Sequence, residues 1–384
     1  MTMPLSRRSL LASGLFGGLA LAWPGLSLAR VAGEQRLVFV IQRGAADGLM
    51  ALGAPGDPQF GAVRGALAED FADAPQIGGL FALHPALAET AKLHAAGEVL
   101  FAPAVASVYR ERSHFDAQNV LETGGARAYA VKDGWLNRLV GLLDGGEARA
   151  LALAATAPPV LRGVNPVSSY APSGLPDAQA ALMGRVAQLY AEDAQLGGLW
   201  DDALRTHGIA EDGEAAGRGA ASLGTLAAAM LTAEGGARIA TIETTRWDTH
   251  YGQRARSNAL LKDLDALLAA LREGMGPAWA NTLVIVATEF GRTVAVNGTG
   301  GTDHGTGSLA WLLGGKVRGG RIVGDWPGLS SSALYQGRDL YPAQSLEALV
   351  AGAIAEHYAL DPEQVGRTLF PAMNGRPVEG LVTA

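Results

Sequence analysis

The sequence predicts an α/β protein with a mixed, mostly parallel central sheet that helices cover on both faces. Short apolar runs that contain β-branched residues alternate along the chain with segments of helical periodicity. The three clearest runs lie at residues 36–41, 238–242 and 282–287. Polar loops with glycine follow them, as is typical of the carboxyl ends of strands in open α/β sheets.

The individual elements follow from composition and punctuation. Continuous apolar runs predict fully buried strands, and amphipathic segments that end at glycine predict helices. In chain order we expect a strand at 36–41, a helix at 87–93, a strand at 99–102, a helix at 114–121, a strand at 238–242, a helix at 258–275 and a strand at 282–287.

The N-terminus has the features of a twin-arginine signal peptide. Arg7 and Arg8 precede an apolar run, Leu11–Leu26, and the small-x-small sequence Ser27-Leu28-Ala29 follows it, so we expect cleavage after residue 29. A membrane anchor is the alternative, but the run is shorter than the roughly 20 residues of a spanning helix and contains Pro24. The prediction is export of the folded chain by the Tat translocase to the periplasm or beyond, which fits a chain without cysteine.

Residues 30–384 are expected to form a single domain with no integral membrane span. Within this domain, a proline-rich stretch at about 155–224 contains one expected helix, at about 177–190. We interpret this stretch as an insertion, which either caps a site or is a surface excursion. The formal charge is −7, or −9 once the two signal arginines are removed, so nucleic acid is not expected as a partner.

Four polar loops carry acids, and two of them also carry histidine. Carboxylate oxygen with imidazole nitrogen suits Zn²⁺, Mn²⁺ or a related divalent ion. A turn or helix-cap role is the alternative for each acid taken singly. The candidate metal ligands are Asp47, Asp248, His250, Glu289, Asp303 and His304. Four histidines without such neighbours are expected to be structural, namely His84, His94, His207 and His357.

Ser113 is the candidate nucleophile. It stands where a helix is expected to begin, so its ordinary role there is an N-cap. The same position would bring its hydroxyl to the amide groups and partial positive charge of a helix N-terminus, which favour a phosphoryl group. A metal nearby would lower the pKa of the hydroxyl further. Arg112 and His114 are the other catalytic candidates, and Arg43 or Arg292 are alternatives to Arg112 for holding phosphoryl oxygens.

A set of short motifs spans nearly the whole chain. Its members are Arg43-Gly44-x-x-Asp47-Gly48, Ser113-His114-Phe115-x-Ala117-Gln118, Glu122-Thr123-Gly124, Gly134-Trp135-Leu136, Trp247-Asp248-Thr249-His250, Thr288-Glu289-Phe290-Gly291-Arg292 and Gly301-Thr302-Asp303-His304-Gly305. With the signal, they resemble the DUF1501 family of twin-arginine-exported bacterial proteins of unknown function. That family is grouped with the alkaline phosphatase and sulfatase superfamily, and the resemblance implies an alkaline phosphatase-like α/β sandwich and a two-metal phosphoesterase-type site.

The resemblance also implies a role for each candidate. Phe290 stands where the superfamily has a histidine ligand, so the chain departs from the two-metal pattern there. Carried over by position, the implied roles are Ser113 as nucleophile, Asp47 as the ligand after the first strand, Asp248 and His250 at one metal, Glu289 at the other, and Asp303 or His304 to complete the set.

Two functions from different classes are consistent with these patterns. The first is an exported hydrolase of phosphate, or less favourably sulfate, esters on small molecules or polymers, with one or two ions of Zn, Mn, Mg or Ca. Phosphate is favoured because the chain lacks cysteine, and because Ser113 does not lie in the [CS]-x-P-x-R motif that is typical of formylglycine sulfatases. The second is a binding or assembly protein that keeps the fold without the chemistry, which the departure at Phe290 favours.

Overall fold

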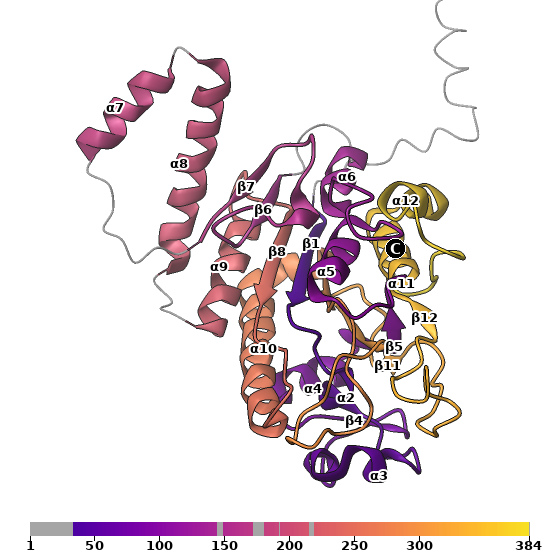
Figure 1. The fold of residues 1–384 in the computed structure, drawn as a ribbon. Coiled ribbons are helices and arrows are strands. Elements are labelled where there is room, and N and C mark those ends of the chain that lie inside the picture. Colours follow the sequence, from indigo (N-terminus) through magenta and orange to yellow (C-terminus); the bar gives the residue numbers. More distant parts are fainter. Residues whose placement is uncertain (1–33, 144–148, 172–179, 192, 215–218, 384) are drawn as a thin grey trace, which may run out of the picture. The chain divides into compact units, whose positions relative to one another are not determined.

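The computed structural model describes residues 34–143, 149–171, 180–191, 193–214 and 219–383, so the expected signal peptide lies outside the described residues (Figure 1). The described residues form a nine-stranded sheet in the order β11-β5-β10-β9-β1-β8-β6-β7, with β12 also paired to β5. Its strands are β1 (Arg36–Gln42), β5 (Val99–Ala106), β6 (Ala150–Ala152), β7 (Val167–Ser169), β8 (Ile239–Thr244), β9 (Thr282–Ala287), β10 (Ser308–Leu313), β11 (Arg321–Ile322) and β12 (Gln344–Ser345).

The sheet is mixed and mostly parallel, as the sequence predicts. β1 lies between β8 and β9 and runs parallel to both, and β6 is parallel to β7 and β8. β10 is the antiparallel exception and pairs with β5 and β9. The carboxyl ends of β1, β8 and β9 therefore lie at one edge of the sheet, which is where their loops gather.

Helices cover both faces of the sheet (Figure 1), which confirms the predicted fold class. α9 and α10 pack on one face and α6, α11 and α12 on the other. The helices are α2 (Gly48–Ala51), α3 (Phe60–Arg64), α4 (Ala88–Ala95), α5 (His114–Thr123), α6 (Trp135–Leu142), α7 (Ala180–Tyr190), α8 (Ala194–Glu214), α9 (Ala220–Thr232), α10 (Gln253–Met275), α11 (Leu346–Tyr358) and α12 (Pro362–Leu369). Short 3₁₀ helices lie at Gly65–Phe71, Pro159–Leu161 and Gly276–Asn281.

Burial on both faces explains why the central strands are apolar without alternation. On β1, Val38 and Val40 belong to the core under α9 and α10, whereas Leu37, Phe39 and Ile41 belong to the core under α6 and α11. Successive strand side chains point to opposite faces, so a strand covered twice requires apolar residues at every position. Residues 37–41 of β1 meet this requirement.

The stretch at 155–224 contains more regular structure than the sequence predicts. Its described residues form β7, α7, α8 and the start of α9, rather than one helix. β7 pairs with β6 and so belongs to the edge of the central sheet. The sequence pattern misses α8 because Gly197, Gly198 and Gly208 lie inside it, and glycine is a poor helix former. A separate antiparallel sheet consists of β2 (Leu52–Gly53), β3 (Gln76–Ile77) and β4 (Phe81–Leu83).

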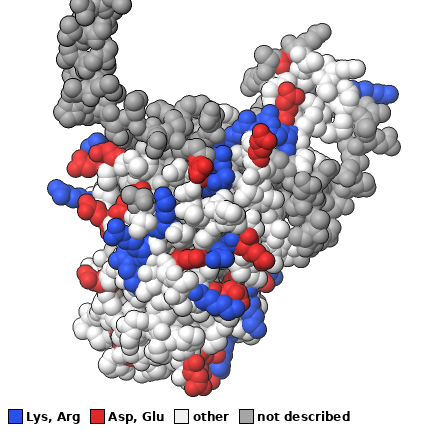
Figure 2. Space-filling view, turned by 180° about the vertical axis from the view of Figure 1, so that it is seen from behind, with Lys and Arg blue, Asp and Glu red and all other residues white. Residues whose placement is uncertain are grey.

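Charges of both signs are interspersed on the face drawn in Figure 2. Several exposed basic side chains of the described residues form ion pairs, for example Arg254 with Glu69 and Arg272 with Glu98. Among the described helices, none is long and apolar enough to cross a membrane.

The imidazole of His357 provides a test of the core. It is buried in α11, and one ring nitrogen lies 3.0 Å from the carbonyl oxygen of Arg36. Burial lowers its pKa from 6.5 to about 4. Between these values the unfolded chain binds more protons than the folded chain, so the free energy of unfolding falls as the pH falls from 6.5 towards 4.

We expect this histidine to remove about 2 kcal/mol of stability between pH 7 and pH 5. Urea unfolding of the wild type and of His357→Gln at both pH values measures the effect. The variant lacks the titrating group, so lowering the pH from 7 to 5 should reduce the free energy of unfolding of the wild type more than that of the variant. If the two proteins differ in free energy of unfolding by the same amount at both pH values, the lowered pKa of His357 is contradicted.

Candidate metal centre

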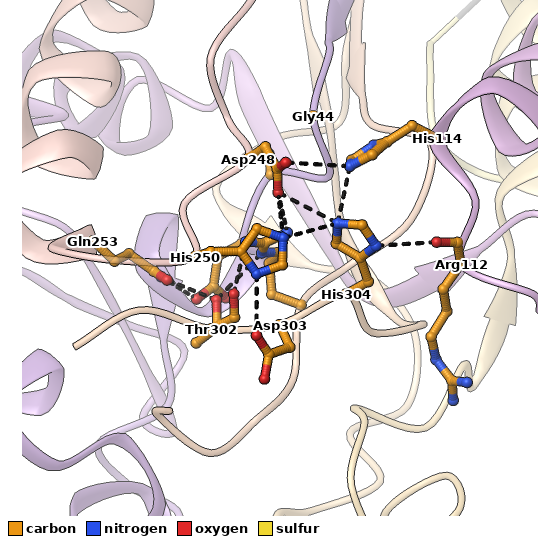
Figure 3. A network of polar contacts seen from close by, with 12 residues as sticks. Gly44, Arg112, His114, Asp248, His250, Gln253, Thr302, Asp303 and His304 are labelled. Carbon is orange, nitrogen blue, oxygen red and sulfur yellow. Dashed lines mark hydrogen bonds and ion pairs between the residues drawn. The ribbon is translucent and has the colours of Figure 1, made fainter. Parts of the chain in front are cut away.

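Four side chains converge beyond the carboxyl ends of β1, β8 and β9 (Figure 3). His114 is the first residue of α5, Asp248 and His250 follow β8, and His304 lies in the loop before β10. The Nε2 atom of His304 lies 3.0 Å from His114 Nε2 and 3.1 Å from His250 Nε2. Oδ1 of Asp248 lies 3.0 Å from His250 Nε2 and 3.4 Å from His304 Nε2, and Oδ2 lies 3.6 Å from His114 Nε2.

Each imidazole is held through its other nitrogen. Nδ1 of His114 lies 2.8 Å from a carboxylate oxygen of Glu289, and Nδ1 of His250 lies 3.0 Å from one of Asp303. Nδ1 of His304 lies 3.1 Å from the carbonyl oxygen of Arg112. All three partners are acceptors, so a neutral ring that carries its proton on Nδ1 offers the lone pair of its Nε2 to the centre.

These residues fit a divalent metal ion. Ligand atoms arranged tetrahedrally at 2.0–2.1 Å from zinc lie about 3.3 Å apart, and the contacts of 3.0–3.6 Å given above are close to that spacing. The required ligand atoms of His114, Asp248 and His304 all lie within 4.8 Å of one another, so this group could hold an ion, and His250 contacts two of its members. The four side chains are about a quarter to two-fifths exposed, which leaves the centre open to solvent.

Burial and neighbouring charges shift the pKa values of three groups at the centre. The hydrogen bond to Glu289 raises the pKa of His114 against the effect of burial. Burial lowers the pKa of His304, and the positive charges of His114 and Arg292 lower it further. Burial alone would raise the pKa of Asp248, but the hydrogen bond and charge of Arg292 keep it below its ordinary value. At neutral pH the centre therefore presents an ionised carboxylate and a neutral His304.

Glycine allows the loops to approach closely enough to form the centre. Gly44 has a φ of +113°, and a Cβ there would lie 2.7 Å from the backbone nitrogen of Asp248. A Cβ on Gly301 would lie 2.2 Å from the carbonyl carbon of His250. Real Cβ atoms do not make such contacts, so only glycine fits at these positions of the motifs after β1 and before β10.

Arg292 fixes the position of Asp248. Its guanidinium is buried and donates to Oδ1 of Asp248 at 2.8 Å and to the carbonyl oxygen of Thr302 at 2.7 Å. The sequence suggests Arg292 as a residue for phosphoryl oxygens, whereas in the structure it joins two of the loops that carry the possible ligands. Arg292 therefore positions the carboxylate of Asp248, and this pairing could not be read from the sequence because the two residues lie 44 positions apart.

Asp47 does not join the centre. Its Oδ1 accepts from the amide of Leu49 as the N-cap of α2, and its Oδ2 accepts from Arg64 and Gln253 at 2.5 Å each. Both of these partners are fully buried. The structure thus does not bring Asp47 into the group of possible ligands, because both carboxylate oxygens have donors and Arg64 balances the charge.

Glu289 and Asp303 lie beside the centre and not in the group of ligand atoms. Glu289 Oε1 accepts from the amide of Gly44 at 2.8 Å and from Gln118 at 3.1 Å, as well as from His114. Its side chain is fully buried. The structure therefore places both acids as partners that orient imidazoles, which is how outer carboxylates act at metal sites. The sequence signal for this was available, since His114 and Gln118 are four residues apart and share one face of α5.

The three catalytic candidates have three different settings. His114 is one of the possible ligands. Arg112 has a φ of +61°, and its side chain turns away to Asp339 and Gln336, so only its carbonyl oxygen faces the centre (Figure 3). In this structure the guanidinium of Arg112 therefore does not face the centre, where the sequence predicts it to hold phosphoryl oxygens. Ser113 is the N-cap of α5, yet its side chain makes no capping hydrogen bond.

Two further acids near the end of β1 are paired with an arginine. Arg43 follows β1 and pairs with Glu122 at 2.7 Å and with Glu243 at 2.6 Å. These pairs raise the pKa of Arg43 despite its burial, so the guanidinium keeps its charge. Among the described residues, a group able to hold a metal is found only at His114, Asp248 and His304.

Similarity to solved structures is weak. The chain resembles the zinc complex of the C-terminal periplasmic domain of EcEptC from Escherichia coli at 9% identity and a TM-score of 0.36, covering 74% of each chain. It resembles Ps i-CgsB in complex with k-i-k-neocarrahexaose at 9% identity and a TM-score of 0.42, covering 88% of this chain and 76% of that one. It also resembles murine ectonucleotide pyrophosphatase/phosphodiesterase 5 in complex with AMP, at 12% identity and a TM-score of 0.31. That match covers 67% of this chain and 57% of the other. Likenesses of this size leave the function of this chain open.

No curated protein matches the chain. A family model, described as a protein of unknown function, matches residues 65–365, which include α5, both loops that carry His250 and His304, and most of the central sheet. The match covers well over half of the sequence. The chain belongs to the DUF1501 family.

Proposed function

We propose that the protein is a metal-dependent hydrolase of phosphate esters with one divalent ion at His114, Asp248, His250 and His304. The observation that supports this most strongly is the orientation of the three imidazoles, whose Nε2 atoms meet while each Nδ1 faces an acceptor. An ion bound there would stabilise negative charge on an ester oxygen and lower the pKa of a nearby hydroxyl or water.

Ser113 is the proposed nucleophile. Its hydroxyl makes no capping bond, and it directly precedes His114. The first amides of α5, those of Phe115 and Asp116, have no acceptor among the described residues, and helix N-terminal amides bind phosphoryl oxygens. The bond from Ser113 Oγ to phosphorus forms as the bond to the alcohol oxygen breaks, and the alcohol leaves with a proton. Water then cleaves the phosphoserine, and inorganic phosphate leaves.

Turnover of 4-nitrophenyl phosphate by the metal-loaded protein tests the proposal. We expect Ser113→Ala to lower kcat by at least about a hundredfold while one metal ion per chain remains bound. Ser330→Ala, which removes an exposed serine, is the matched control. Equal turnover in the wild type and Ser113→Ala would exclude this serine as the nucleophile.

The alternative is an exported protein that binds or assembles without chemistry. It is favoured by the ion pairs that neutralise Asp47, Glu122 and Glu243, because these leave no second metal for a two-metal mechanism. A protein that binds one metal ion but turns over no ester would support this alternative.

Export by the Tat translocase and a periplasmic or external location remain part of the proposal. They rest on Arg7, Arg8 and the sequence up to residue 29, which lie outside the described residues. N-terminal sequencing of the mature protein, with residue 30 expected first, checks this.

A further inference from the structure

A pocket of about 470 Å³ opens beside α5. One face of the helix lines it with Phe115, Gln118, Asn119 and Glu122, whose spacing of three and four residues places them together. The segment that follows α5, including Tyr129 and Lys132, and the residues around Pro159 complete the lining. The volume is in the range of small-molecule sites, about 300–1,000 Å³. We call this the α5 pocket.

The α5 pocket adjoins the metal centre. Gln118 lines the pocket and donates to Glu289 at 3.1 Å, and the same oxygen of Glu289 lies 2.8 Å from Nδ1 of His114. Phe115 lines the pocket and directly follows His114 in the chain. The pocket and the centre thus share the first turns of α5, so one ligand of moderate length can contact both.

The lining carries an excess of positive charge in a chain that is acidic overall. Arg43 and Glu122 both line the pocket and pair with each other, and Arg43 also pairs with Glu243. Lys132 and Arg162 are exposed and have no acidic partner among the described residues. Two unpaired cations at a pocket of this size attract an anionic ligand.

The lining also contains two exposed aromatic rings. Phe115 is 80% exposed and Tyr129 is 65% exposed, which is unusual for large rings that serve only packing. Tyr129 has a φ of +62°, and its amide donates to Asn119 at 2.7 Å, so the backbone is fixed in a conformation that costs about 1 kcal/mol or more. Exposed rings at a pocket offer flat surfaces for stacking a ligand ring.

We propose that the α5 pocket binds the leaving-group part of the substrate, and that this part is a ring with a second anionic substituent. The ring contacts Phe115 and Tyr129, and the substituent pairs with Lys132 and Arg162. This inference rests on the proposed hydrolase function, since it places the ester bond at the metal centre. The substrate class is therefore acidic aryl or other ring-bearing phosphate esters.

Two substrates that differ in one carboxylate test the inference. For the wild type we expect kcat/KM to be about tenfold higher with 4-carboxyphenyl phosphate than with phenyl phosphate, mainly through KM. In the double variant Lys132→Gln/Arg162→Gln this ratio should fall to about one. Lys262→Gln, which removes an exposed lysine of α10 outside the pocket, is the matched control and should keep the ratio.

Binding without turnover separates this inference from the hydrolase proposal. Calorimetric titration of 2,6-naphthalenedicarboxylate and 2-naphthoate is made into the wild type and the double variant. Turnover with a ratio near one in the wild type, or with an unchanged ratio in the double variant, overturns the inference and leaves the hydrolase proposal standing. Absence of turnover, with tighter dicarboxylate binding that the double variant loses, overturns the hydrolase and supports the anionic pocket. Absence of both overturns both.

Discussion

The His304→Ala protein is expected to bind no stoichiometric metal, whereas the wild-type chain is expected to bind one divalent ion per molecule. His304 Nε2 has contacts with the Nε2 atoms of His114 and His250, so its loss removes the nitrogen that links the other two rings. Because removing even an outer partner of a ligand lowers metal affinity about 10- to 100-fold, loss of the ligand itself should exceed that. Metal analysis after dialysis against trace chelator is the measurement.

A graded series sharpens this prediction. Asp303→Asn keeps all possible ligands but weakens the acceptor for Nδ1 of His250, so we expect a loss of affinity of about 10- to 100-fold. His207→Ala removes an exposed histidine of α8 and serves as the matched control, with unchanged metal content. A His304→Ala protein that retains one ion per chain, or a wild type that binds two, would contradict the single centre.

Asp47→Asn is expected to destabilise the protein by about 3–5 kcal/mol without changing its metal content. The variant keeps an acceptor for the amide of Leu49 but leaves Arg64, which is fully buried, without a counter-charge. Breaking one side of a buried ion pair costs more than the pair contributes, because the remaining charge is not solvated. Urea unfolding measures the change, and metal analysis of the folded protein accompanies it.

The partner variant provides the control for this prediction. In Asp47→Asn/Arg64→Met the unpaired charge is gone, so much of the lost stability should return. The resemblance to two-metal phosphoesterases predicts a different result, in which Asp47→Asn loses metal. Loss of metal with little change in stability would restore Asp47 as a ligand and contradict the structural role.

Ion pairs with two arginines limit the acids that are available to a metal near the end of β1. Arg64 forms an ion pair with Asp47, and Arg43 forms ion pairs with Glu122 and Glu243, so the charges of these acids are already balanced. The remaining donor set supports one ion. Phe290, which the sequence marks as the departure from the two-metal pattern, is buried and packs against the rings of His114 and His304 at 5.0 and 5.2 Å. It thus supports two possible ligands sterically and supplies no donor.

The strands and the helix at the nucleophile motif could be predicted from the sequence because their signals are local. The apolar run at 36–41 became β1, and the run at 282–287 became β9 with the same bounds. The helix expected at 114–121 is α5, His114–Thr123. Burial on both faces requires continuous apolar residues, and a glycine in the left-handed conformation ends α5 at Gly124. Neither requirement depends on distant residues.

The sequence by itself determined that acids and histidines follow the strand ends, and therefore that a metal-type donor set gathers at one edge of the sheet. Only the tertiary structure decided which of them can be ligands. The possible ligand atoms meet in four side chains, those of His114, Asp248, His250 and His304. By contrast, the charge of Asp47 is balanced by Arg64, and the carboxylate of Asp303 contacts Nδ1 of His250. The reason is that residue type fixes which atoms can bind a cation, but long-range pairing fixes which of those atoms already have a partner.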